Sequence, residues 1–178
     1  MMYLKSLFGD PIEITQTEFS NQIKQALKDV KKIELSENLI HNPSDALSFV
    51  QTVLEGYKSM LEQRVVAERT LRGILRNVCK ISLCHYSSCS DNAIKKSYFY
   101  LKELLEKKNA DYGNSALKNG GMIGNYVRIL DKVSRIESLQ KSAVCNFESL
   151  QDTWLDLAGY AIIGLVILRT ISEKTQES

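Results

Sequence analysis

Three acidic side chains lie in or beside the most apolar stretch of the chain. Residues 153–168 read TWLDLAGYAIIGLVIL, with Asp156 inside this run and Glu148 and Asp152 just before it. The spacing i, i+4, i+8 places all three on one narrow face of a helix. A carboxylate among apolar side chains requires a partner, because burying an unpaired charge is very costly. That partner is a basic side chain, a metal ion or a substrate.

The stretch before this run supplies the nearest positive charges. In NYVRILDKVSRIESL, residues 125–139, a turn of 100° per residue places four polar side chains within one arc of about 100° of a helix. They are Arg128, Asp131, Lys132 and Arg135. Taken alone, this pattern is that of an amphipathic helix whose polar face is solvated.

Two arrangements of these acids and bases are open. In the first, the three bases neutralise the three acids in a buried salt-bridge network. In the second, some of the acids hold Mg²⁺ while the bases bind phosphate groups. Glu148 and Asp156 are about 12 Å apart along the helix axis, so one ion cannot bind all three acids. Either Glu148 with Asp152 or Asp152 with Asp156 would share an ion.

A glycine-rich loop lies beside these helices. DYGNSALKNGGMIGNY, residues 111–126, holds four of the nine glycines. The end of the loop leaves free backbone N–H groups at the start of the next helix, where an anion can bind. Asp111 and Tyr112 stand at its entrance, and Tyr112 either stacks on a base or packs into the core. Glu103 and Glu106 form an E-x-x-E pair that is either solvated or metal-binding.

Cysteine and histidine residues form a second candidate metal site. Cys79, Cys84, His85 and Cys89 lie within eleven residues, and all four are potential zinc ligands. The spacing C-x4-C-H-x3-C is not that of the usual zinc motifs, and the adjacent Cys84 and His85 are poorly placed to bind one ion. We therefore favour buried or interhelical thiols over a zinc site.

Composition narrows the class of protein. Hydrophobic residues make up 44% and charged residues 25% of the 178 residues, as in ordinary globular proteins. The net charge of +2 indicates neither an extended nucleic-acid surface nor a polybasic membrane patch. The first residues, MMYLKSLFGDPIEI, carry Lys and Asp where a signal peptide is apolar. The apolar run near the C-terminus is shorter than a membrane span. We expect a cytoplasmic protein without membrane contact.

The apolar periodicity predicts an all-α fold, and only two prolines interrupt the chain. We expect a helical bundle of about five helices, including one long helix over about residues 45–82. The others are expected at residues 15–33, 91–108, 126–141 and 147–172. A boundary near residue 90 would separate an N-terminal helical segment, 1–90, from a C-terminal core, 91–178. The long helix and the apolar last helix also favour a homo-oligomer.

Three segments resemble a known family. KNADYGNSA, NYVRILDKVSRIESL and ESLQDTWLDLAGYAIIGLVIL resemble the nucleotide modification associated domain 1 family over about residues 104–170. The D-Y-G, R-x-x-D-K-x-x-R and D-T-x-x-D-L-A-x-Y-A elements carry the resemblance. The family is common in phages and mobile elements and is associated with nucleotide or modified-base metabolism. Its layout is similar to the all-α nucleotide pyrophosphatases of the MazG and dimeric dUTPase group, in which acids on helices hold Mg²⁺.

The resemblance implies roles for particular residues. Catalytic roles would fall to Asp131, Glu148 and Asp152, and the Mg²⁺ ligands would be Glu148, Asp152 and Asp156. Substrate-binding roles would fall to Asp111, Tyr112, Arg128, Lys132, Arg135 and Tyr160. The pyrophosphatases have a second acidic element E-x-x-D, whereas Glu148 and Asp152 form E-x-x-x-D.

We therefore predict a nucleotide-directed protein that binds a nucleoside triphosphate or modified nucleotide together with Mg²⁺. Such a site would support cleavage between the α- and β-phosphates, with carboxylates positioning Mg²⁺ and water while the bases stabilise the phosphate charge. Two alternatives stay open. One is a module that binds or sequesters a nucleotide unchanged. The other is a helical interaction protein in which the acids and bases form only a structural salt-bridge network.

Overall fold

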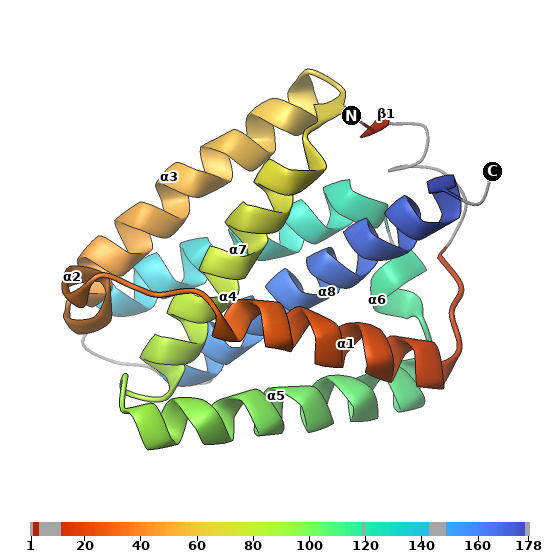
Figure 1. Cartoon of the computed structure of the whole chain (residues 1–178). Coiled ribbons are helices and arrows are strands. Elements are labelled where there is room, and N and C mark those ends of the chain that lie inside the picture. Colours follow the sequence, from red (N-terminus) through yellow and green to blue (C-terminus); the bar gives the residue numbers. More distant parts are fainter. Residues whose placement is uncertain (1, 4–11, 119, 143–148, 177–178) are drawn as a thin grey trace.

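Helices pack around one central helix in this protein (Figure 1). The structure is a computed structural model that describes residues 2–3, 12–118, 120–142 and 149–176. The helices are α1 Gln16–Lys31, α2 Glu37–His41, α3 Pro43–Glu62, α4 Glu68–Tyr86, α5 Asp91–Tyr112, α6 Ser115–Lys118, α7 Gly121–Lys141 and α8 Leu150–Gln176. Two short strands, β1 Met2–Tyr3 and β2 Val65–Val66, pair antiparallel. The predicted all-α class with a long helix is confirmed, and the longest helix is α8, with 27 residues.

The predicted continuous helix over residues 45–82 is wrong, because the chain turns between α3 and α4. Arg64 has a left-handed φ of 55°, and the next two residues form β2. Val66 is fully buried, and β-branched side chains pack well in a strand, so tertiary burial favours the break. No glycine or proline marks the position. With α2 and α6, the described part of the chain has eight helices, where about five were predicted.

Local capping explains where the predicted helices begin. The Thr15 hydroxyl accepts the Glu18 backbone N–H, and the Glu18 carboxylate accepts the Thr15 backbone N–H, which forms a capping box at α1. The Asn42 side chain caps α3, whose first residue is Pro43. Ser90 caps α5 through the Ala93 backbone N–H. These signals are local, so the sequence places the starts of α1, α3 and α5 to within two residues, whereas α7 begins five residues before its predicted start.

The core surrounds α8, which packs against α1, α4, α5 and α7. Helices from both halves of the chain, 1–90 and 91–178, contribute to one hydrophobic core. The stretch Leu150–Glu173 is long and apolar enough to cross a membrane by length and composition, so the predicted shortfall in length is wrong. Most of this stretch is buried inside the protein, as expected of a core helix.

A buried polar contact holds α7 against α3 and α8. Asn125, only 1% exposed, donates its side-chain N–H to the Tyr160 backbone carbonyl at 2.8 Å. The Tyr57 hydroxyl donates to the Met122 carbonyl at 3.0 Å. Burial raises the pKa of Tyr57 well above its ordinary value, so its hydroxyl remains a neutral donor. Gly164 makes room for this contact, because a Cβ there would lie 2.5 Å from Asn125 Oδ1.

Substitution Gly164→Ala tests this close approach. We expect it to lower the free energy of unfolding by about 1–3 kcal/mol, because either the added methyl or Asn125 must move. Gly73→Ala in α4 is the matched control, since a Cβ at Gly73 meets no atom within 4 Å. The control should stabilise the protein by up to about 1 kcal/mol through helix propensity. Urea denaturation measures both variants, and equal effects would contradict the steric role of Gly164.

Candidate functional site

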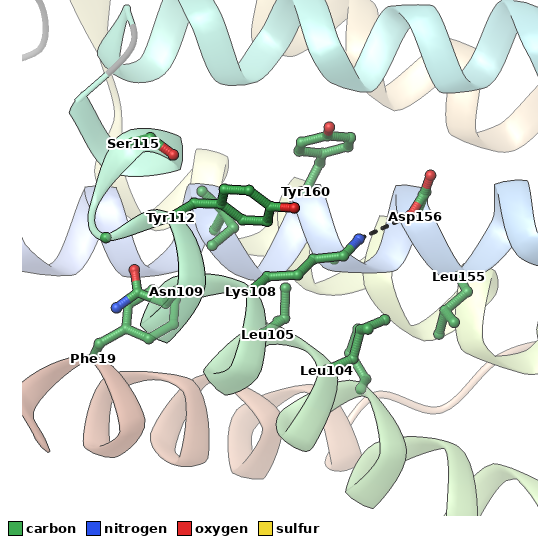
Figure 2. Close-up of a pocket in the computed structure, with 14 residues that line it drawn as sticks. Phe19, Leu104, Leu105, Lys108, Asn109, Tyr112, Ser115, Leu155, Asp156 and Tyr160 are labelled. Carbon is green, nitrogen blue, oxygen red and sulfur yellow. Dashed lines mark ion pairs between the residues drawn. The ribbon is translucent and has the colours of Figure 1, made fainter. Parts of the chain in front are cut away.

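A cavity of about 150 Å³ opens between α5 and α8 (Figure 2). Phe19 from α1 and Ser115 from α6 complete its wall. The apolar part of the lining comes from leucines of α5 and from α8. These residues are Leu101, Leu104, Leu105, Leu155 and Ile163. The polar residues of the lining are Lys108, Asn109, Tyr112, Ser115, Asp156 and Tyr160. The cavity thus combines apolar walls with a few polar groups, as ligand sites in proteins commonly do.

Gly159 gives the cavity part of its depth. It lies on α8 between Asp156 and Ile163, where any side chain would project toward α5. A Cβ at this position would lie 3.5 Å from Leu105 Cδ2 and 3.8 Å from Leu101 Cδ1, which are ordinary contact distances. A methyl group would therefore fit without a clash, but it would occupy space that is now part of the cavity.

Asp156 finds its partners in two lysines from different helices. Its Oδ2 lies 3.0 Å from Lys132 Nζ of α7, and its Oδ1 lies 3.7 Å from Lys108 Nζ of α5. The Lys132 side chain is only 16% exposed, whereas that of Lys108 is 53% exposed. The Lys132 pair is thus the short, shielded one, and the Lys108 pair is long and open to solvent. The apolar helix keeps its carboxylate because α7 supplies a cation.

Two tyrosines stand beside this ion pair. Tyr112 and Tyr160 both line the cavity, and Figure 2 shows the Lys108 side chain extending below the Tyr112 ring toward Asp156. Tyr112 is 72% exposed, so its ring does not pack into the core, which was the alternative to a stacking role. Tyr160 is half-buried. Asn109, buried at the same end of α5, donates to the Gln16 side chain at 2.6 Å, which fixes its orientation.

Asp152 has a different local role. It lies in the first turn of α8, is exposed, and accepts the Ser149 hydroxyl at 2.6 Å. The Ser149 hydroxyl in turn accepts the Asp152 backbone N–H at 2.9 Å, so the two residues cap the start of α8. A carboxylate at a helix N-terminus is also stabilised by the helix dipole. Asp152 does not line the cavity.

The predicted site residues fall into three sets. Asp156, Tyr112 and Tyr160 line the cavity, and Lys132 joins them through its ion pair with Asp156. The second set does not line the cavity: Asp111, Asp131 and Asp152 are exposed, while Arg128 and Arg135 are half-buried. Glu148 lies outside the described residues. The roles of all these residues stay predictions.

Residues missed at the sequence level include Lys108, Asn109, Ser115 and Gly159. Lys108 precedes Tyr112 by four residues and therefore shares its face of α5, which is a signal the sequence contained. Gly159 follows Asp156 by three residues on α8. A glycine in a helix does not reveal whether it leaves space for a neighbour or for a ligand.

The described residues contain no group of three or more His, Cys, Asp or Glu side chains placed to hold one metal ion. Cys84 and Cys89 form a disulfide, so the prediction of thiols is wrong for these two, and Cys79 is a buried free thiol. His85 Nε2 lies 2.8 Å from the Leu39 carbonyl oxygen, to which it can donate. Three of the four residues considered as zinc ligands, Cys84, Cys89 and His85, therefore have other partners.

Comparison with protein families matches residues 108–168 to the model of nucleotide modification associated domain 1. The match spans about a third of the chain and confirms the resemblance expected from the sequence. Every polar residue that lines the cavity, from Lys108 to Tyr160, lies within it. No curated protein and no solved structure matches the chain. The similarity in layout to the MazG and dimeric dUTPase group stays a prediction.

Substitution Asp156→Asn tests the ion pair with Lys132. We expect a loss of about 1–3 kcal/mol in the free energy of unfolding, because a largely buried ammonium loses a carboxylate partner. Lys108→Met should cost less than about 1 kcal/mol, since its pair is solvent-exposed. A double-mutant cycle with Lys132→Met, followed by urea denaturation, gives the coupling energy. Additive effects of Asp156→Asn and Lys132→Met would contradict the pairing.

His85 should make the free energy of unfolding depend on pH, and the direction of this effect follows from its pKa. Burial lowers its pKa below the ordinary 6.5, and this outweighs the opposing effect of the hydrogen bond with Leu39. The unfolded chain therefore binds more protons as the pH falls through 6.5, so His85 makes the folded state lose stability there. Urea denaturation at several pH values gives the free energy of unfolding as a function of pH. Below pH 6.5 this free energy should fall as the pH falls, and it should fall less steeply in His85→Gln. An unchanged slope would refute the assignment.

Proposed function

We propose that this protein, which carries a nucleotide modification associated domain over residues 108–168, binds a nucleotide with the base in the cavity between α5 and α8. The observation that carries this proposal is the combination of one small apolar cavity with an Asp156–Lys108 ion pair and two tyrosines at the same place. Apolar walls suit the faces of a base, and the polar groups suit its edge and the attached phosphates.

The cavity volume favours a base with one ring. Pockets for drug-sized ligands measure roughly 300–1,000 Å³. A cavity near 150 Å³ in an apolar core is known to hold a single benzene-sized ring, and this cavity has about that volume. A pyrimidine ring matches this volume, whereas the larger purine would extend beyond it. The sugar and phosphates would lie outside, beside Tyr112 and Lys108.

Lys108 is the residue best placed to bind phosphate. Its ammonium is 3.7 Å from Asp156, and its side chain is 53% exposed. An exposed ion pair is worth roughly 0–1 kcal/mol, so Lys108 can exchange this contact for a phosphate at little cost. The Lys132 ammonium lies 3.0 Å from Asp156 and is largely shielded from solvent. Lys132 therefore continues to neutralise the Asp156 carboxylate when Lys108 moves to a phosphate. Tyr112, exposed beside Lys108, offers a ring face for stacking.

Mg²⁺ fits this arrangement poorly. The ion binds oxygen ligands in nearly octahedral geometry. Among the described residues, Asp156 is engaged by two lysines and Asp152 by Ser149, and no third acid joins them. We therefore favour binding or sequestration of a nucleotide over Mg²⁺-dependent pyrophosphohydrolysis.

Isothermal titration with pyrimidine and purine nucleosides and their triphosphates, each with and without Mg²⁺, tests the proposed function. We expect pyrimidine compounds to bind more tightly and to need no Mg²⁺. Lys108→Met should lower the affinity for the triphosphate by about tenfold and leave the affinity for the nucleoside nearly unchanged, because only the triphosphate carries phosphates. No binding by any compound would refute the proposal.

The cavity itself is tested by Gly159→Ala. The added methyl removes volume where the base would lie, so pyrimidine affinity should fall by about tenfold or more. Gly73→Ala is the matched control, since it makes the same change in a helix outside the cavity. Thermal denaturation should show that Gly159→Ala is no less stable than the wild type. Chromatography after incubation with triphosphate and Mg²⁺ distinguishes the alternatives, because a monophosphate product would support the pyrophosphohydrolase instead.

A further inference from the structure

A second concave surface lies elsewhere on α1 and α8. It is a groove of about 580 Å³ between α1 and the C-terminal part of α8, and it shares no residue with the cavity described above. In Figure 1, α1 crosses in front of α8. The charged lining residues are all basic: Lys24, Lys28, Lys31 and Arg169. The side-chain amides of Asn21, Gln22 and Gln25 complete the lining.

The three lysines form a row of like charge on one face of α1. Their spacing, i, i+4, i+7, makes them neighbours on the helix surface, where like charges repel. Within the described part of the chain, neither Lys24 nor Lys28 forms an ion pair. Lys31 lies 5.1 Å from the centre of the Tyr98 ring, a cation–π contact that leaves its charge in place. An anion in the groove would relieve this repulsion.

The acid beside the groove is already paired. Glu173 accepts Arg169 Nε and Gln22 Nε2, both at 2.9 Å. A guanidinium has five N–H donors, and this pair uses only the one at Nε. Gln22 Oε1 is buried and has no hydrogen-bond partner among the described residues. Glu173 therefore orients Arg169 and Gln22 but does not neutralise the lysines of α1.

More positive charge lies next to the groove. Arg72 and Arg76 of α4, with Arg169, line a small adjoining hollow. Arg72 pairs with Glu68, and Asp29, also in this hollow, pairs with Lys32 at 3.3 Å. Arg76 Nε is buried without a hydrogen-bond partner in the described residues. Basic groups therefore outnumber acidic ones on α1, α4 and α8 around the groove.

We propose that this groove binds an oligophosphate, that is, a pyrophosphate or triphosphate chain. Lysine ammonium groups and a guanidinium are the usual partners of phosphate oxygens, and the amides of Asn21 and Gln25 can donate further hydrogen bonds. No aromatic side chain lines the groove, so it has no platform on which a base could stack. Recognition there depends on the phosphates alone, and this site is independent of the proposed nucleotide site.

Isothermal titration of the full chain with pyrophosphate and with tripolyphosphate tests this site. We expect binding that weakens as the NaCl concentration rises, because salt screens charge. The double variant Lys24→Gln, Lys28→Gln should bind at least about tenfold more weakly. The matched control is Lys95→Gln, Lys96→Gln, which removes two exposed lysines of α5 outside the groove and should bind as the wild type does. Circular dichroism checks that both variants are folded.

Three results would overturn the oligophosphate site. The first is that pyrophosphate does not bind at low salt. The second is that the two double variants lose equal affinity for pyrophosphate. The third is that Lys108→Met loses more pyrophosphate affinity than Lys24→Gln, Lys28→Gln does. Failure here is distinguishable from failure of the nucleotide site, because a nucleoside without phosphates reports only on the cavity. A competition experiment with Gly159→Ala identifies the source of the phosphates. If a nucleoside triphosphate displaces pyrophosphate from the groove, the ligand is the phosphate chain of a nucleotide. If pyrophosphate stays bound, the ligand is a free oligophosphate.

Discussion

The pairing of Asp156 with Lys132 is the interaction on which the candidate site depends. Helix α8 is apolar around most of its surface and lies at the centre of the core, so a charge on it must be neutralised by a neighbouring helix. Lys132 does this from α7 at 3.0 Å. The contact fixes the position of α7 relative to α8 near the cavity. It also allows a second, weaker cation, Lys108, to remain close to the same carboxylate.

The two lysines around Asp156 differ in a way that matters for binding. A partly buried ion pair is costly to break, whereas an exposed one contributes little. Lys132 therefore acts as a fixed counter-charge, and Lys108 is available to a ligand. Lys24 and Lys28 on α1, which form no ion pair within the described part of the chain, lie in the separate groove. Two regions with different chemistry result: one combines apolar walls with a solvent-exposed cation, and the other offers charge and amides without an aromatic side chain.

Most helices could be predicted from the sequence because their signals are local. These signals are the periodic apolar faces of α1, α5 and α7, the continuous apolar run of α8, and the caps at Thr15, Asn42 and Ser90. Each involves residues close together in the sequence. The break between α3 and α4 could not be predicted in this way. It depends on the left-handed Arg64 and on strand pairing with Met2–Tyr3, more than sixty residues away, and neither glycine nor proline marks it.

The sequence by itself indicated that Asp156 needs a partner and that about residues 104–170 resemble nucleotide modification associated domain 1, whose model matches residues 108–168. Burial cost and motif spacing are properties of the chain alone. Only the tertiary structure decided which cations pair with Asp156. The packing of α5 and α7 near α8 brings Lys108 and Lys132, rather than other nearby basic residues, to this carboxylate. The tertiary structure also decided that Gly159 lines a cavity. Whether a missing side chain leaves a cavity depends on the neighbours that pack against it, and these come from distant parts of the sequence.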